Sequence, residues 1–314
     1  MHRTRPAPRC WIGTTVALLA FTLSIPGYAK VLHEERSVYT RIIVEDERNL
    51  RCLKFTLVRE NSRQTCMDRN NPQRLVFDYA KMTLSALLLK PDPKRILIIG
   101  LGGGTLPMAL RDILPSTVID TVEIDEAVVR VAKRFFGFAE DDQNRVYVQD
   151  ARVFGKRAAL RGEQYDLIIL DAFDGEYIPE HLMTIEFLGE MRDLLSDDGV
   201  LVANTFASSK LYDYESATYA EAFGDFLNFR LPTSGNRVIL VPQAKLDIDA
   251  RTPLDRKSLR ANADALEVPM APYDIPLKRY VGTLLSLNGQ KPDWNSRIRP
   301  LTDQFSPANV LQSQ

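Results

Sequence analysis

The sequence is poor in the residues that usually build metal sites. Only three cysteines and three histidines occur among its 314 residues, the histidines are scattered, and no two cysteines form a CxxC pair. These spacings exclude the common zinc sites, so we expect no metal cofactor. A chain of this length can bury a core large enough to fold without structural zinc or a disulfide framework.

An excess of charge of either sign is also lacking. The 40 Lys+Arg nearly balance the 41 Asp+Glu, and the formal net charge is −1. This balance excludes a globally basic nucleic-acid-binding protein, and we expect no nucleic-acid partner. A hydrophobic content of 45% excludes a mainly disordered chain. The absence of a GxSxG elbow argues against a serine hydrolase.

The first 29 residues differ from the rest, because they contain three arginines, no acid and one apolar run. The arginines precede the run Trp11–Ile25, and Gly27 and Ala29 are small residues placed as in a cleavage site. The pattern predicts a signal peptide over residues 1–29 and an exported, periplasmic protein without a stable membrane span after cleavage. Two alternatives remain: an uncleaved anchor, or a start-site artefact on a cytoplasmic protein.

Export affects the interpretation of Cys52 and Cys66. Residues 39–44, 50–58 and 63–67 are predicted to be short strands, and a hairpin among them places the two cysteines opposite each other. In an oxidising compartment they can form a disulfide, whose loop of about 15 residues would contribute about 3 kcal/mol. Alternatively, both stay reduced as small apolar strand residues.

After these strands, predicted helices and strands alternate. Continuous apolar runs such as those at 95–99 and 165–170 are typical of parallel strands buried on both faces by helices. The expected strands cover 95–99, 118–123, 145–148, 165–170, 199–204 and 237–241, and the expected helices 72–89, 105–114, 126–136, 153–160, 179–195 and 212–227. The fold class is therefore α/β with a doubly wound, mostly parallel sheet.

A glycine-rich turn follows the first strand of this sheet. Gly100, Gly102 and Gly104 let the backbone turn tightly and approach a ligand at the start of the next helix. Their GxGxG spacing is typical of S-adenosylmethionine-binding folds, whereas a dinucleotide fingerprint has GxGxxG. We expect all three glycines to contact the bound nucleoside.

Acidic residues lie at the carboxyl ends of the next two strands. Ligands of such sheets bind beyond the carboxyl ends of the strands. Glu123 ends the second strand, where it can accept from both ribose hydroxyls. Asp150 and Ala151 end the third, where the carboxylate can accept from an adenine amino group. The alternative for each acid is that it only caps the following helix.

The fourth strand ends in two further carboxylates, Asp171 and Asp174. An amine that is alkylated must lose a proton, and a carboxylate at the mouth of the site can accept it. A second carboxylate can bind the ammonium group of a cationic substrate. The alternative for Asp174 is a turn with an Asx-type hydrogen bond. We interpret His181 as a surface or capping residue.

Together these residues make the sequence similar to the spermidine/spermine synthase family of polyamine aminopropyltransferases over roughly residues 37–242. The shared motifs are the strand with Gln64, Tyr79-Ala80-Lys81-Met82, the glycine-rich turn, Val122-Glu123-Ile124-Asp125, Asp150-Ala151, Asp171–Asp174 and Thr302-Asp303-Gln304-Phe305-Ser306-Pro307.

The resemblance implies a seven-stranded Rossmann-like sheet of the S-adenosylmethionine-methyltransferase type. It implies that Gln64, Glu123 and Asp150 contact the nucleoside and that Asp171 is the catalytic base. It also implies that Tyr79 and Asp174 bind the amine substrate.

Two departures from the family pattern affect the expected chemistry. The family turn reads GGGDGG, and its aspartate helps hold the amine of decarboxylated S-adenosylmethionine, whereas this chain has GLGGGT. Lys81 replaces a family glutamate, and an ammonium group there would repel a diamine. A turn without the acid also suits ordinary S-adenosylmethionine, whose carboxylate it does not repel.

Three hypotheses follow. The first is a spermidine-synthase-like transferase that moves an aminopropyl group from decarboxylated S-adenosylmethionine to an amine or polyamine. The second is an S-adenosylmethionine-dependent methyltransferase. The third is an exported, non-catalytic protein that binds nucleosides or polyamines. A homodimer is a further expectation. The expected parts are the signal peptide at 1–29, an N-terminal β-strand domain at 30–71, the nucleoside-binding catalytic domain at 72–244 and a helical C-terminal appendage at 245–314.

Overall fold

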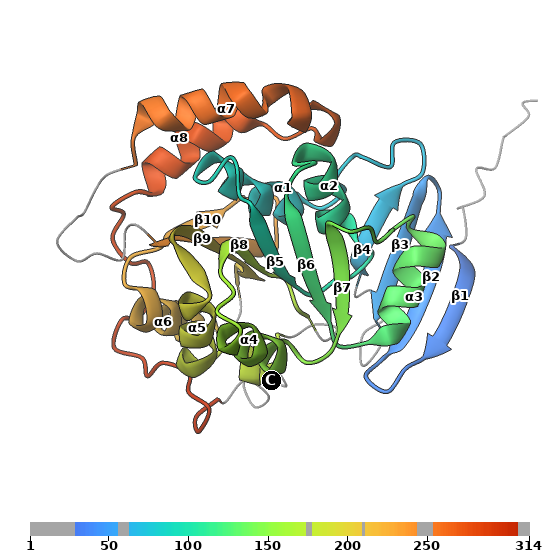
Figure 1. Ribbon diagram of the computed structural model, residues 1–314, viewed down its shortest axis with the longest axis horizontal. Coiled ribbons are helices and arrows are strands. Elements are labelled where there is room, and N and C mark those ends of the chain that lie inside the picture. Colours follow the sequence, from blue (N-terminus) through green and yellow to red (C-terminus); the bar gives the residue numbers. More distant parts are fainter. Residues whose placement is uncertain (1–28, 56–62, 174–177, 209–210, 244–253, 307–314) are drawn as a thin grey trace, which may run out of the picture.

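Two β-sheets lie side by side in the computed structural model (Figure 1). The structure describes residues 29–55, 63–173, 178–208, 211–243 and 254–306. The predicted signal peptide, apart from its last residue, and Asp174 lie outside this part of the chain. Within these ranges, none of the helices combines the length and the apolar character that crossing a bilayer requires.

The N-terminal sheet has four antiparallel strands in sequence order. They are β1 (Lys30–Arg36), β2 (Arg41–Glu47), β3 (Leu50–Phe55) and β4 (Arg63–Asp68). Strand β1 was not predicted, because its residues are mostly polar and it lies at the edge of the sheet. One face packs on helix α3 (Glu126–Phe135), with Val44, Leu53 and Val128 in the shared core.

The disulfide lies within this sheet. Cys52 and Cys66 are opposite each other in the β3–β4 register, and their sulfur atoms are bonded. Of the two alternatives that the sequence leaves open, the structure therefore has the disulfide.

The main sheet has seven strands in the order β10-β11-β9-β8-β5-β6-β7. Strands β5 to β9 are parallel, whereas β10 and β11 are antiparallel to their neighbours. This confirms the predicted mostly parallel, seven-stranded fold class. The strands are β5 (Arg95–Ile99), β6 (Val118–Glu123), β7 (Asn144–Val148), β8 (Tyr165–Leu170), β9 (Leu195–Phe206), β10 (Leu227–Arg230) and β11 (Asn236–Pro242).

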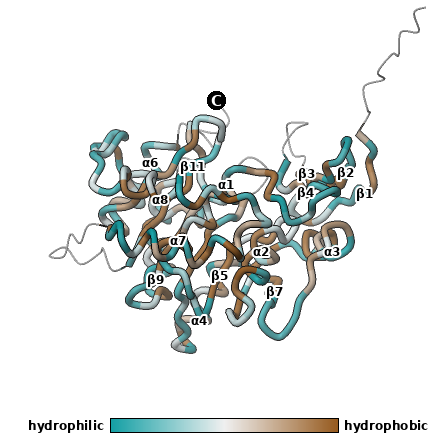
Figure 2. Tube along the Cα trace, turned by 90° about the horizontal axis from the view of Figure 1, so that it is seen from above, coloured by the Kyte–Doolittle hydropathy of each residue, from teal (hydrophilic) through white to brown (hydrophobic). Residues whose placement is uncertain are grey.

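Helices cover both faces of the main sheet (Figure 1). One face packs on α1 (Asp78–Leu84), η1 (Ser85–Leu88), α2 (Thr105–Ile113), α7 (Arg256–Met270) and α8 (Leu277–Leu287). The other packs on α4 (Ala151–Leu160), α5 (Ile185–Asp193) and α6 (Tyr212–Phe223). Short 3-10 turns, η2 (Glu180–Leu182) and η4 (Ala271–Tyr273), precede α5 and α8. In Figure 2 the chain at α2 and β5 is largely brown, because these elements lie in the core.

Several predicted boundaries were wrong. The helix predicted over 72–89 is shorter and begins at Asp78, and the one over 179–195 divides into η2 and α5. The helix predicted over 212–227 ends at Phe223, because Gly224 has a φ of 71° that no helical residue adopts. Residues Leu227–Arg230 then form β10, the seventh strand, with alternating burial.

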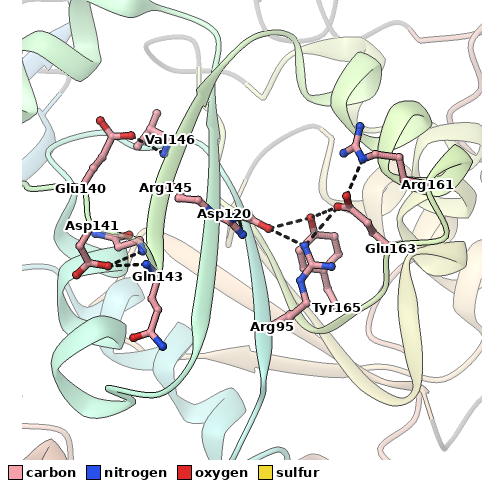
Figure 3. Close-up of polar contacts among 11 residues, drawn as sticks. Arg95, Asp120, Glu140, Asp141, Gln143, Arg145, Val146, Arg161, Glu163 and Tyr165 are labelled. Carbon is pink, nitrogen blue, oxygen red and sulfur yellow. Dashed lines mark hydrogen bonds and ion pairs between the residues drawn. The ribbon is translucent and has the colours of Figure 1, made fainter.

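The amino-terminal ends of the parallel strands are joined by a polar network (Figure 3). Asp120 on β6 is almost fully buried and accepts hydrogen bonds from Arg95 on β5 (3.0 Å), Arg145 on β7 (3.0 Å) and the hydroxyl of Tyr165 on β8 (3.2 Å). These bonds compensate the buried carboxylate and tie four strands together. This end of the sheet is thus a structural one, opposite the edge at which a ligand is expected.

Candidate active site

A cavity of about 270 Å³ lies at the carboxyl ends of β5, β6, β7 and β8. Gln64, Tyr79, Gly100, Gly102, Glu123, Asp150, Ala151 and Asp171, all singled out from the sequence, line it together. The opposite wall is formed by the N-terminal sheet, through residues that include Phe55 and Cys66. Asp174 lies outside the described residues, so its predicted role as amine anchor stays a prediction.

The glycine-rich turn is held by side chains from both sheets. The Leu101 N–H donates to Glu123 Oε2 (3.0 Å), and the Gly103 N–H donates to Thr65 Oγ1 on β4 (3.0 Å). Gly104 is not among the residues that line the cavity, although it was expected to contact the nucleoside. Gly104 has a φ of 78° at the start of α2, and a Cβ atom there would lie 2.6 Å from the ring of Phe138.

Glu123 is fixed by backbone donors on both sides. Besides the bond from Leu101, its Oε1 accepts from the N–H of Asp125 (3.0 Å). Burial raises the pKa of Glu123, and these backbone hydrogen bonds work in the opposite direction. A carboxylate held in this way presents its remaining lone pairs at a fixed angle, as recognition of a vicinal pair of ribose hydroxyls requires.

Asp150 caps a helix and also lines the cavity, so the capping role does not exclude the predicted adenine contact. Its Oδ1 accepts from the Val153 N–H (2.9 Å), which caps helix α4, while the residue also lines the cavity. Its Oδ2 lies 3.1 Å from Nε2 of His181, which lines the cavity as well. The interpretation of His181 as a surface or capping residue agrees with its half-exposed side chain but did not include this contact. The position of His181 in the sequence, shortly after the acids that follow β8, could have indicated that it lies at the site.

Asp171 lies where β8 ends and has two side-chain partners. The Asn204 Nδ2 group on β9 donates to Asp171 Oδ1 (2.8 Å), and the hydroxyl of Tyr79 on α1 is hydrogen-bonded to the same carboxyl group. Burial raises the pKa of Asp171 to about 7, although both hydrogen bonds lower it. A carboxyl group with this pKa can accept a proton at neutral pH and release it again. Asn204 was not predicted as a site residue.

Lys81 is not among the residues that line the cavity. Its Nζ lies 3.1 Å from Asp274 Oδ2, which belongs to the C-terminal part of the chain. The neighbouring residues Tyr79 and Ala80 do line the cavity, because successive helical residues face different directions. The structure therefore does not place Lys81 among the lining residues, and the expected repulsion of a diamine stays a prediction.

The charges that line the cavity are negative. Four carboxylates contribute, Glu123, Asp125, Asp150 and Asp171, and among the lining residues that the structure describes there is no lysine or arginine. Such a lining favours a cationic ligand over one with a free carboxylate. In the described ranges, no group of three histidine, cysteine, aspartate or glutamate side chains is arranged to hold a metal ion.

Comparisons with a family model and with known proteins point to the same family. Residues 77–233 match the family model of the spermine/spermidine synthase domain. The chain is 48% identical to a polyamine aminopropyltransferase of Vibrio vulnificus (strain CMCP6), over 91% of this chain and 93% of that protein.

Solved structures share the fold. The spermidine synthase of Thermotoga maritima superposes with a TM-score of 0.54 at 22% identity, covering 82% of this chain and 88% of that one. Human methyltransferase-like protein 13, in complex with SAH, superposes with a TM-score of 0.52 at 25% identity, covering 70% of this chain and 93% of that one.

Proposed function

The chain belongs to the spermine/spermidine synthase family, and on that premise we propose that it moves an aminopropyl group from decarboxylated S-adenosylmethionine to an amine. It is a polyamine aminopropyltransferase, an alkyl transferase. The observation that carries the proposed chemistry is the environment of Asp171, a carboxyl group in the wall of the cavity whose pKa burial raises to about 7.

The donor nucleoside would lie against the strand ends. Glu123 would accept from the ribose hydroxyls, Asp150 from the adenine amino group, and Gln64 would contact the nucleoside from β4. The acidic lining supports a donor that carries a sulfonium and an ammonium group but no carboxylate. This favours decarboxylated S-adenosylmethionine, even though the glycine-rich turn lacks the acid of the family pattern.

Asp171 would act as the general base of a one-step displacement. The lone pair of the acceptor nitrogen attacks the aminopropyl carbon that is bonded to sulfur. The C–N bond forms as the C–S bond breaks, and the sulfur keeps the bonding electron pair and leaves in neutral methylthioadenosine. Asp171 takes one proton from the nitrogen and later passes it to water, while Tyr79 keeps the carboxylate oriented. Asp174 would bind a distant ammonium group of the amine.

Methyl transfer is the second candidate, favoured by the likeness to the human methyltransferase-like protein. It would need S-adenosylmethionine, whose carboxylate would meet an acidic wall. Calorimetric titration separates the two enzymes, since tighter binding of S-adenosylhomocysteine than of methylthioadenosine would support methyl transfer.

The decisive experiment is an assay of the purified protein with decarboxylated S-adenosylmethionine and putrescine, spermidine or cadaverine, in which methylthioadenosine release is measured. We expect turnover that Asp171→Asn abolishes. Binding of methylthioadenosine without turnover on any of these amines would instead support the non-catalytic binder. Light scattering of the same sample measures the expected homodimer.

Export remains part of the proposal. The leader pattern of residues 1–29 supports it, and so does the disulfide, because structural disulfides persist mainly in oxidising compartments. Cell fractionation with N-terminal sequencing tests it. A periplasmic protein that starts at Lys30 is expected, whereas an intact chain in the cytoplasm would overturn export and leave the transferase proposal untouched.

A further inference from the structure

Two side-chain amides, those of Asn204 on β9 and Asn236 on β11, connect Asp171 to the antiparallel part of the main sheet. Asn204, which is 4% exposed, donates from Nδ2 to Asp171 Oδ1 at 2.8 Å. The Oδ1 of Asn204 in turn accepts from Nδ2 of Asn236 on β11 at 3.0 Å. Both polar ends of the Asn204 amide are therefore engaged, one by the carboxylate and one by a second amide.

Strand register makes this contact possible. Asn204 on β9 pairs with Val238 on β11, so Asn236 is its diagonal neighbour two residues along the strand and points to the same face of the sheet. The backbone N–H of Asn236 donates to Ser234 Oγ (3.1 Å), which holds the start of the strand. Asn236 is thus placed by the sheet rather than by a flexible loop.

The orientation of the Asn204 amide determines whether its N–H group or its oxygen faces Asp171. The carboxylate of Asp171 only accepts, so the N–H end of Asn204 faces it and the oxygen end faces Asn236. The donor from Asn236 satisfies that oxygen and so stabilises this direction of the amide. Without Asn236 the oxygen loses its donor, and the preference for this direction becomes weaker.

The charged surroundings of Asp171 come from several elements. Tyr79 on α1 contacts it directly. Behind Asn204, Glu215 of α6 and Arg237 of β11 form a buried ion pair at 3.0 Å that is neutral overall. Among the residues that the structure describes, the other titratable side chains that line the cavity are Tyr39, Glu123, Asp125, Asp150 and His181.

We propose that Asn236 is a positioning residue for proton transfer, because it locks the Asn204 amide with its N–H group toward Asp171. This inference rests on the proposed role of Asp171 as the base. One carboxylate oxygen of Asp171 then always receives a hydrogen bond, so the proton from the amine goes to the other oxygen. The locked donor also stabilises the ionised form of Asp171, the form that can act as a base.

The test is the substitution Asn236→Asp, which replaces a donor by an acceptor. The new carboxylate attracts the N–H end of Asn204, so the amide turns and its oxygen faces Asp171. Asp171 then favours its protonated form. With decarboxylated S-adenosylmethionine and putrescine, the acid limb of the kcat/KM profile should move up by about one pH unit, which means about a tenfold loss below neutral pH that alkaline pH restores.

Gly235→Asp is the matched control for added charge. Gly235 is exposed, its φ is not in the left-handed region, and a Cβ atom there meets nothing within 4 Å. It brings the same charge to the adjacent position without touching Asn204, so it should keep the parental profile. An equal shift in both variants, or an unchanged profile in Asn236→Asp, would overturn the proposal.

Two further measurements distinguish failure of this inference from misfolding of the variant and from failure of the proposed function. If Asn236→Asp does not fold, Asn236→Ala decides, because it frees the amide without adding charge, and an unshifted profile would overturn the proposal. Carbon-13 NMR of labelled aspartate carboxyls, assigned with Asp171→Asn, follows the titration of Asp171 without turnover. Absence of turnover in the parent protein would therefore reject the transferase, while the NMR titration would still decide the role of Asn236.

Discussion

The backbones of Gly100 and Asp171 approach so closely that a Cβ atom on Gly100 would lie 2.4 Å from the carbonyl oxygen of Asp171. Gly100 also has a φ of 99°, which side-chain-bearing residues rarely adopt. The first glycine of the turn and the proposed base are therefore one structural unit. The turn cannot accept a side chain at this position without moving the base.

Gly100→Ala should consequently abolish most of the activity. We expect a loss of at least about 100-fold in kcat/KM, because a displacement of about 1 Å at a reacting group has this effect, together with a clear loss of stability. Gly162→Ala is the control, since Gly162 also has a positive φ of 68° but has open space around it. It should cost about 1 kcal/mol in denaturant unfolding and leave kcat/KM unchanged. Similar activities for the two variants would contradict the close-contact explanation.

The activity should depend on the ionisation of Asp171. Because its pKa is raised to about 7, kcat/KM should rise about tenfold per pH unit below neutral pH and bend near pH 7. The acceptor amine, whose pKa lies near 10, binds as an ammonium ion over this whole range, so its own ionisation adds no bend near neutral pH. Initial rates of methylthioadenosine release across the neutral range check this. A profile without a bend near pH 7 would show that another group is the base.

Asp171→Asn should lose turnover by about 100-fold or more and yet stabilise the fold. The folded-state pKa of Asp171 lies above its ordinary value of 3.8, so its ionisation costs stability that grows as the pH rises from about 4 to about 7. The amide avoids this cost, which amounts to about 2–4 kcal/mol at alkaline pH. Urea unfolding should therefore show a larger gain near pH 8 than near pH 5. A variant that is less stable than the parent near pH 8 would contradict the burial of an ionised base.

Lys81→Ala should not change amine recognition. Lys81 pairs with Asp274, which is mostly exposed, so the substitution should cost about 1 kcal/mol or less of stability and change the KM for putrescine by less than about twofold. Steady-state kinetics with putrescine measure it. A tenfold fall in KM would mean that the ammonium group does reach the pocket.

Removal of the disulfide should weaken both the fold and the donor site. The bridge closes a loop over 14 positions, so Cys52→Ala with Cys66→Ala should lower the free energy of unfolding by about 3 kcal/mol. Cys66 and Gln64 both line the cavity from β4, so the affinity for methylthioadenosine in calorimetry should fall as well. Unchanged affinity in the folded variant would show that the wall keeps its shape without the bridge.

The fold class and the edge that carries the cavity could be predicted from the sequence, because both follow from local patterns. Parallel strands buried on two faces read as continuous apolar runs, and their carboxyl ends meet at one edge. Glu123, Asp150 and Asp171 therefore come together once the alternation is recognised. Strand β10 was missed because its four residues alternate between buried and exposed after a helix that looked continuous.

The partners of these acids could not be predicted in the same way, since they depend on strand order. Asn204 meets Asp171 only because β9 lies beside β8, and Asn236 meets Asn204 only because β11 returns antiparallel to β9. The direction of Lys81 is likewise settled by Asp274, which is 193 positions away along the chain. Sequence separation of this size leaves no periodic signal.

The shared wall of the cavity has an evolutionary consequence. The acids proposed for catalysis and nucleoside binding stand on the main sheet, whereas Phe55, Gln64 and Cys66 belong to a separate small sheet. Substitutions in that sheet can reshape the pocket while the reacting groups keep their positions. The same catalytic framework can thereby acquire new donors or acceptors through changes in a module that has no part in the chemical step.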